Sequence, residues 1–171
     1  MIRVFTDTAA NLPPEVLEKY HIRTLPLTYR VDGELPEGEF DGPAYYDAIR
    51  GGAEVKTAMV NPQDTAEGME PVLAAGLDVL YVGFSSGLST TYQSGCIAAD
   101  DLREKYPERK ILTVDSLCAS LGQGLYVYLG ALEQQAGKTI EQVRDYLEEI
   151  KLHLCHWFTV DDLMYLKRGG R

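Results

Sequence analysis

The chain has 171 residues, of which 45% are apolar and 25% are charged, a composition typical of one folded domain with its own core. Its 26 acidic and 16 basic residues give a formal net charge of −10, which disfavours nucleic acid and anionic membrane surfaces as partners. No apolar run reaches the roughly 20 residues that a membrane-spanning helix needs, so we expect no stable membrane insertion.

The N-terminus and the cysteines both indicate a cytoplasmic protein. The chain enters a strand-like run at Ile2–Phe5 directly, without the features of a signal peptide. Cys96, Cys118 and Cys155 are odd in number and widely spaced, which supports neither a disulfide framework nor a zinc site. We therefore expect reduced thiols and no bound metal.

The first third of the chain alternates short strand-like and helical patterns. Paired prolines open a short helix, and an Asp-Gly turn closes the second strand. The expected elements are strands at 2–5 and 23–31, helices at 14–20 and 43–50, and an acidic, glycine-rich loop at 32–42.

The remainder continues the alternation with longer helices. Continuous apolar runs indicate strands that are buried on both faces. The expected elements are an extended or irregular stretch at 55–62, helices at 62–75, 88–106, 116–136 and 139–152, strands at 78–84, 110–114 and 154–160, and a helical turn from 161.

This order of elements predicts an α/β fold with a mostly parallel sheet and helices on both faces. The closing run Lys167–Arg171 is basic and glycine-rich, as in segments that join two domains. We therefore expect an α/β domain over residues 1–163, the start of an interdomain linker at 164–171, and a second domain that is absent from this chain. Such an absence predicts an exposed apolar face and self-association through it.

A cluster of hydroxyl side chains follows the strand predicted at 78–84. Ser85, Ser86, Ser89 and Thr90 lie where that strand ends and a helix begins, with Gly87 among them. Ligands of open parallel sheets bind beyond the carboxyl ends of the strands, and the amides at a helix N-terminus favour an anion. One interpretation is therefore an anion site, and the other is simple helix capping.

The same residues also match a nucleophile-elbow pattern. Gly83-Phe84-Ser85-Ser86-Gly87 fits G-x-S-x-G between a strand and a helix, and Asp115 and then His153 or His156 complete the order of a hydrolase triad. Both histidines flank the start of a predicted strand, at the opposite edge of the sheet from Ser85. A serine hydrolase therefore stays the alternative function.

A second candidate contact lies on the irregular stretch at 55–62. Thr57 is followed by Ala58, Met59 and Val60, which suggests an apolar lining with one polar group. Such a lining suits a ligand with an apolar body and a single polar head. The chain contains neither a P-loop motif nor a Rossmann fingerprint, so we expect no nucleotide cofactor.

Five blocks of the sequence resemble, in order, the motifs of the DegV family. This family comprises bacterial fatty-acid-binding proteins and includes the FakB subunits of fatty acid kinase. The matching blocks are Phe5-Thr6-Asp7-Thr8-Ala9-Ala10-Asn11-Leu12-Pro13, Lys56-Thr57-Ala58-Met59, Ser85 to Ser94, Asp115-Ser116 with Ser120 and Gly122, and Asp162 to Arg171.

The resemblance implies the N-terminal domain of a two-domain protein that holds a long-chain fatty acid between its lobes. Thr57 and Ser89 match the expected carboxylate contacts, and the hydroxyls of Ser85, Ser86 and Thr90 lie next to Ser89 in the chain. It further implies a carrier without a catalytic nucleophile or cofactor, which presents the acyl chain to an ATP-dependent fatty acid kinase subunit.

Overall fold

A computed structural model describes residues 2–36, 38, 40–160 and 162–168. The chain divides into two compact units. Unit 1 comprises the residues up to Pro26 together with Val60–Thr159. Unit 2 comprises Leu27–Met59 together with the residues from Val160 onward. Each unit is described by itself.

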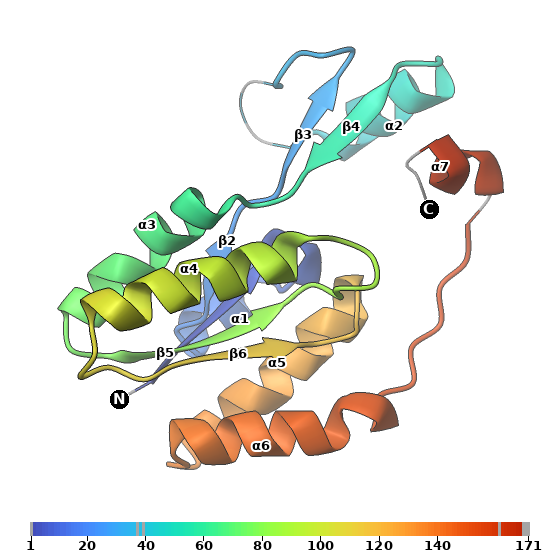
Figure 1. Ribbon diagram of the computed structural model, residues 1–171. Coiled ribbons are helices and arrows are strands. Elements are labelled where there is room, and N and C mark those ends of the chain that lie inside the picture. The colour runs from blue at the N-terminus through green and yellow to red at the C-terminus, as the bar shows by residue number, and fades with distance from the viewer. Residues whose placement is uncertain (1, 37, 39, 161, 169–171) are drawn as a thin grey trace. The chain divides into compact units, whose positions relative to one another are not determined.

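Unit 1 is built on a four-stranded sheet whose neighbouring strands are all parallel (Figure 1). Apolar, β-branched residues fill its two central strands, as a sheet covered on both faces requires. The strands, in their order across the sheet, are β2 (Arg23–Leu25), β1 (Ile2–Asp7), β5 (Asp78–Gly83) and β6 (Ile111–Asp115).

Helices cover both faces of this sheet, so the predicted α/β fold with a mostly parallel sheet is confirmed. One face carries α1 (Pro14–Lys19), α5 (Ser120–Gln135) and α6 (Ile140–Ile150), and the other carries α3 (Pro62–Ala74) and α4 (Thr91–Lys105). Short 3-10 turns lie at η1 (Thr8–Ala10) and η2 (Lys151–His153).

Large buried side chains hold the layers together. On the first face, the Tyr126 hydroxyl donates to the Leu147 carbonyl at 2.5 Å and so joins α5 to α6. On the second face, the ring of Tyr81 in β5 fills the space beside Gly95 of α4. Burial raises the pKa of both tyrosines, so their hydroxyls stay protonated.

Unit 2 is built on an antiparallel pair, β3 (Thr28–Val31) and β4 (Val55–Ala58). It also contains α2 (Gly42–Arg50), which Asp41 caps by accepting a hydrogen bond from the Ala44 amide, and α7 (Leu163–Arg168). An aromatic cluster joins β3 to α2: the ring of Tyr29 lies edge-on to that of Tyr45, with centroids 5.0 Å apart.

Two of the expected strands are wrong. The run 23–31 is not one strand, because Pro26 and Leu27 interrupt it and β2 and β3 belong to different sheets. Proline lacks the amide that a continuous ladder needs. The run 154–160 forms no regular structure, and Trp157 in it is 97% exposed. Its apolar residues find no neighbouring strand with which to pair among the described residues.

Two helices begin later than expected. The helix expected from residue 88 begins at Thr91, and the one expected from 116 begins at Ser120. Both are preceded by loops that contain serine side chains bonded to nearby backbone amides. A serine side chain that bonds a nearby backbone amide in this way competes with the helical hydrogen bonds, so the helix begins at a later residue.

Candidate functional site

The candidate site lies at the carboxyl edge of the sheet in unit 1. The strand order reverses between β1 and β5, because the chain adds β2 on one side of β1 and later β5 and β6 on the other. Ligands of open α/β sheets bind outside the carboxyl ends of the strands at such a switch point. Here those ends are Asp7 and Gly83, and the segment Phe84–Thr90, which we call the hydroxyl loop, follows directly.

The backbone amides of the hydroxyl loop are already used within the protein. Every amide from Phe84 to Ser89 donates to a protein acceptor, either a distant residue or the Ser85 side chain or carbonyl. The bonds are Phe84 N to Asp7 Oδ2 (2.8 Å), Ser85 N to the Cys118 carbonyl (3.1 Å), Ser86 N to Asp115 Oδ1 (3.2 Å), Gly87 N to Ser85 Oγ (3.3 Å), and Leu88 N (3.0 Å) and Ser89 N (3.1 Å) to the Ser85 carbonyl. The loop therefore offers hydroxyls to a ligand.

The hydroxyls of the loop differ in their accessibility. Ser86 and Thr90 are exposed, Ser89 is half-buried, and Ser85 is only 6% exposed. Ser89 Oγ accepts a hydrogen bond from the Thr91 amide at 3.2 Å and lies 2.9 Å from Thr91 Oγ1. Ser89 is not the N-cap of α4, which is Thr90 without a side-chain cap bond, but its bond to the Thr91 amide orders the start of that helix. Ser86, Ser89 and Thr90 are therefore the more accessible hydroxyl residues of the loop.

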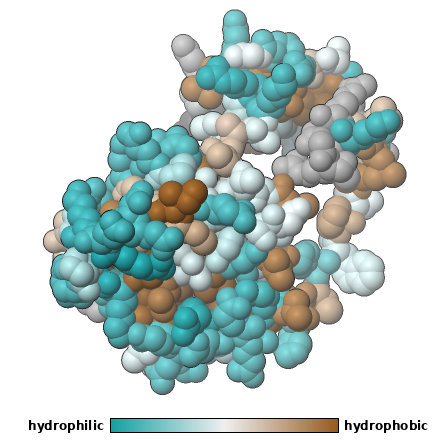
Figure 2. Space-filling model, viewed as in Figure 1, coloured by the Kyte–Doolittle hydropathy of each residue, from teal (hydrophilic) through white to brown (hydrophobic). Residues whose placement is uncertain are grey.

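Exposed apolar side chains lie in the hydroxyl loop itself and on the segments that follow β6. Leu88 in the loop, Leu117 after β6, and Leu121 and Leu125 of α5 are between 42% and 69% exposed. Figure 2 shows apolar residues at the surface in several places between hydrophilic ones. Leu117 has a φ of 52°, a conformation that is costly for a leucine and that occurs mostly where function requires it. The site thus combines polar hydroxyls with an apolar border.

A buried polar group, Asp7, bonds the first residue of the loop, a contact that the sequence analysis did not predict. Asp7 is fully buried, and its carboxylate accepts hydrogen bonds from the amides of Phe84 and Ala9 and from Gln123 Nε2. Gln123 Nε2 also reaches Thr6 Oγ1 at 3.0 Å. Burial is the main cause that raises the pKa of Asp7, and these hydrogen bonds oppose it.

The described residues do not assemble the hydrolase triad. The Ser85 hydroxyl accepts from the Gly87 amide, and Asp115 Oδ1 accepts from the amides of Ser86 and Leu117. Neither His153 nor His156 forms a hydrogen bond with Ser85 or Asp115 in the described part of the chain. His153 is exposed, and the His156 ring lies against Gly122. The serine hydrolase is therefore not supported.

The fifth predicted contact, Thr57, belongs to unit 2. It is exposed on β4 and lies directly opposite Tyr29 of β3. Residues opposite each other in an antiparallel pair point to the same face, so Thr57 shares a face with Tyr29 and Val31. The other four predicted contacts share the hydroxyl loop of unit 1.

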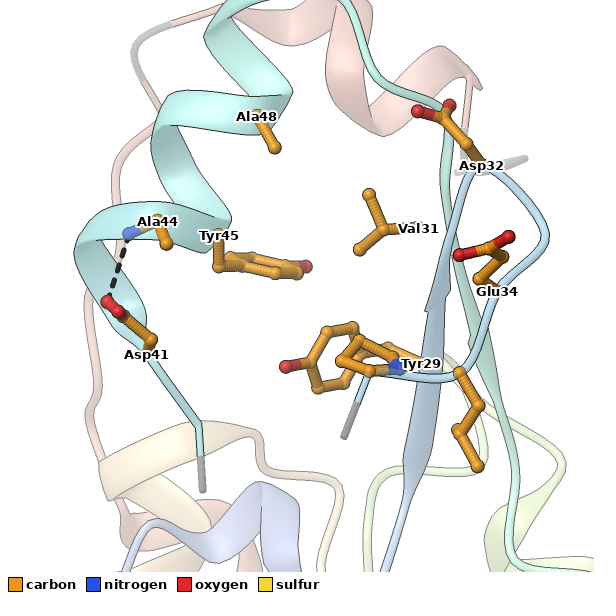
Figure 3. Close-up of a pocket in the computed structure, with 10 residues that line it drawn as sticks. Tyr29, Val31, Asp32, Glu34, Asp41, Ala44, Tyr45 and Ala48 are labelled. Carbon is orange, nitrogen blue, oxygen red and sulfur yellow. Dashed lines mark hydrogen bonds between the residues drawn. The ribbon is translucent and has the colours of Figure 1, made fainter. Parts of the chain in front are cut away.

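Unit 2 contains a pocket of about 760 Å³ that the sequence analysis missed (Figure 3). Tyr29 and Tyr45 point into it from β3 and α2, and acidic side chains lie along its border. Its lining is Tyr29, Val31, Asp32, Glu34, Leu35, Pro36, Asp41, Ala44, Tyr45 and Ala48. Carboxylates repel an anionic head group, so this pocket is a poorer carboxylate site than the hydroxyl loop.

The described residues contain no group of three or more His, Cys, Asp or Glu side chains that could hold a metal ion. Within that same part of the chain, no helix has the length and apolar character required to cross a bilayer. Cys96, Cys118 and Cys155 are all free thiols, as expected.

Solved structures similar to this chain include two that are described as fatty-acid-binding DegV proteins. The protein from Thermus thermophilus is 30% identical with a TM-score of 0.87, and the one from Bacillus subtilis is 28% identical with a TM-score of 0.81. Each comparison covers 99% of this chain and 60% of the other.

Curated relatives and a family model agree with this likeness. A DegV domain-containing protein of Clostridium perfringens is 41% identical over 98% of this chain, and one of Lactococcus lactis is 36% identical over 99%. The chain spans 59% and 60% of the length of these two relatives. The family model described as "Uncharacterised protein, DegV family" matches residues 1–171. The chain belongs to the DegV family, as its five sequence blocks indicated.

Proposed function

We propose that this chain binds a long-chain fatty acid and acts as a carrier, not as an enzyme. The observation that carries the proposal is a set of accessible hydroxyl residues at the switch point of the sheet, with exposed leucines on the segments that follow β5 and β6. Hydroxyls donate hydrogen bonds to a carboxylate, and leucines stabilise an acyl chain by burial. The fatty-acid-binding descriptions of the Thermus and Bacillus relatives support the same ligand.

The head-group contacts that we propose are Ser89 and Thr57, with Ser86 and Thr90 beside Ser89. Ser85 supports the loop from within, since its side chain and carbonyl both accept backbone amides. Thr57 enters on the resemblance of its block to the family motif, and its hydroxyl is exposed on β4.

The proposal extends to the biological context of the chain. We propose a cytoplasmic protein that presents the bound acyl chain to an ATP-dependent fatty acid kinase subunit. A second domain, following a linker that starts at residue 164, would cover the ligand in the longer relatives. Ser85 Oγ and Asp115 Oδ1 accept from backbone amides, which suits a role in which the partner performs the chemistry.

Analysis of co-purified lipid tests the ligand. The purified chain is measured by native mass spectrometry, and its solvent extract is analysed for free fatty acids. We expect a long-chain fatty acid in about stoichiometric amount, and re-binding of that acid but not of its methyl ester after delipidation. An extract without fatty acid, together with labelling of Ser85 by a serine-directed fluorophosphonate, would instead favour the hydrolase.

A further inference from the structure

We propose that Asp7 is the residue that positions the hydroxyl loop, through a carboxylate whose two oxygens both serve as backbone acceptors. The importance of this role for a ligand rests on the proposed function. The positioning itself does not depend on the proposed function, because the contacts that position the loop are present in the free protein.

The Asp7 carboxylate connects three separate segments. Oδ2 accepts from the Phe84 amide at 2.8 Å, at the first residue of the hydroxyl loop. Oδ1 accepts from the Ala9 amide and from Gln123 Nε2, both at 3.1 Å. The end of β1, the turn η1, helix α5 and the loop after β5 therefore meet at one side chain. The two oxygens together accept hydrogen bonds from three N–H groups. This pattern matches an ionised carboxylate, which has no proton to donate and only accepts hydrogen bonds.

The cost of this arrangement points to a role beyond filling space. Asp7 has no exposed surface, and no ion pair of its carboxylate is found among the described residues. A buried carboxylate without a cation destabilises the fold unless hydrogen bonds compensate for lost hydration. A neutral residue of similar volume would fill the same space, but it could not accept three donors at these positions.

Asp115, which accepts from the hydroxyl loop at Ser86, two residues after Phe84, provides a matched comparison. Its Oδ1 alone accepts both the Ser86 amide at 3.2 Å and the Leu117 amide at 3.1 Å. An asparagine at 115 keeps that oxygen and therefore both bonds. An asparagine at position 7 keeps one oxygen only, and its amide group must face a donor. The same isosteric change is therefore tolerated at Asp115 and disruptive at Asp7.

Gln123 fixes the orientation of the Asp7 carboxylate. The glutamine is fully buried, its Nε2 bonds Asp7 and Thr6, and its Oε1 has no hydrogen-bond partner among the described residues. Because the donor end of the amide is directed at the carboxylate, removing that donor holds the carboxylate less firmly and so weakens its bonds to Ala9 and Phe84 without removing them. Gln123→Met is accordingly a milder test that retains the side-chain length.

The first experiment measures amide hydrogen exchange in the ligand-free protein. We expect exchange in the segment Phe84–Ser89 to be about tenfold faster or more in Asp7→Asn, with the interiors of β6 and α6 unchanged. Asp115→Asn should leave the segment within about twofold of the wild type. If Asp7→Asn is not folded by circular dichroism, Gln123→Met should show a smaller acceleration at Ala9 and Phe84. The proposal would be overturned if the amides exchanged at the same rate in the wild type, in Asp7→Asn and in Gln123→Met.

The second experiment measures binding of a dansylated long-chain fatty acid to the delipidated variants. We expect Asp7→Asn to bind at least about tenfold more weakly than Asp115→Asn, while both keep the wild-type fold. A wild type that does not bind the probe contradicts the proposed function, and the exchange data then still decide the role of Asp7. Unchanged affinity in Asp7→Asn with accelerated exchange would show that the loop is positioned but that binding does not depend on it, which overturns the link to the ligand.

Discussion

Ser89 shows how one hydroxyl can serve both folding and binding. Its Oγ accepts the Thr91 amide and so orders the start of α4, while its half-buried position leaves it within reach of a ligand. Hydrogen bonds to a charged partner contribute more than neutral ones. The contribution of Ser89 to a carboxylate ligand should therefore exceed its contribution to the fold.

We predict that Ser89→Ala weakens fatty acid binding by roughly 1–3 kcal/mol, about 5- to 150-fold in Kd, because it removes a donor to the carboxylate. Isothermal titration calorimetry of the delipidated protein gives the Kd, and urea unfolding gives the loss of stability from the missing cap. Ser89→Thr is the control, since it retains the hydroxyl. An affinity of Ser89→Ala equal to that of the wild type would remove this residue from the site.

The raised pKa of Asp7 predicts a specific dependence of stability on pH. The folded state holds the Asp7 proton more tightly than the unfolded state, in which the pKa of this carboxyl has its ordinary value of about 3.8. The contribution of Asp7 to the free energy of unfolding is therefore greatest below that pH and falls as pH rises through the folded-state pKa. The opposite holds for Glu141, whose pKa Lys110 lowers to about 2.

Urea unfolding of the wild type and of Asp7→Asn across the acidic range tests this sign. We expect the difference in unfolding free energy, wild type minus variant, to decrease as pH rises from below 3.8. Glu141→Gln is the control, for which the same difference should increase with pH above about 2. A difference for Asp7→Asn that grows with pH would mean that its pKa is lowered by folding.

The hydroxyl residues could be predicted from the sequence, whereas Asp7 and Gln123 could not. Ser85–Thr90 are adjacent in the chain and follow an evident buried strand. The partners of Asp7 lie 77 and 116 positions away, and only the strand order brings them together. The same limit applies to the loop amides: the sequence suggested that they face an anion, but distant acceptors such as the Cys118 carbonyl occupy them.

At the scale of elements, the packing of α4 on β5 depends on the absence of a side chain. A Cβ placed on Gly95 would lie 2.0 Å from Cε1 of Tyr81, which is fully buried. The ring cannot move without disturbing the centre of the sheet, because interiors are close-packed. Gly68 of α3 differs, since its Cβ would meet only the tip of Leu25 at 2.8 Å.

We predict that Gly95→Ala destabilises the protein by about 1–3 kcal/mol or more, because the added methyl group forces α4 away from Tyr81. Gly68→Ala is the matched control in a neighbouring helix. We expect its free energy of unfolding to stay within about 1 kcal/mol of the wild type, since alanine also favours the helix. Urea unfolding measures both variants, and an equal effect of the two changes would contradict the difference in packing.

The strands of unit 1 that could be predicted from the sequence are those whose residue pattern is determined by burial alone. β5 and β6 are continuous apolar runs, and such runs indicate a strand covered on both faces. The run 154–160 has a similar composition but no neighbouring strand among the described residues, and a sequence pattern carries no information about pairing. The break at Pro26 could have been read from the sequence, because proline interrupts the ladder between β2 and β3.

At the scale of the whole molecule, two opposing features govern association. The surface of unit 1 exposes Leu121 and Leu125 on α5, and the nearby Leu117 and Leu88 extend this apolar area. Exposed apolar area favours association, whereas the net charge of −10 on each copy opposes it. Salt screens the repulsion over a Debye length of about 10 Å at 0.1 M and leaves apolar burial intact.

We therefore predict that the chain self-associates through this leucine surface and that association strengthens with salt. Light scattering should show a weight-average mass that rises with protein concentration, more steeply at high sodium chloride than at low. The double change Leu121→Lys and Leu125→Lys should keep the protein monomeric, because both side chains are exposed and contribute little to the core. Leu152→Lys, at a still more exposed position on η2, is the control and should associate like the wild type. A wild type that stays monomeric at high protein and salt concentrations would exclude association through this surface.

Saturation with fatty acid should weaken the association as well, because the same leucines border the hydroxyl loop and an acyl chain would cover them.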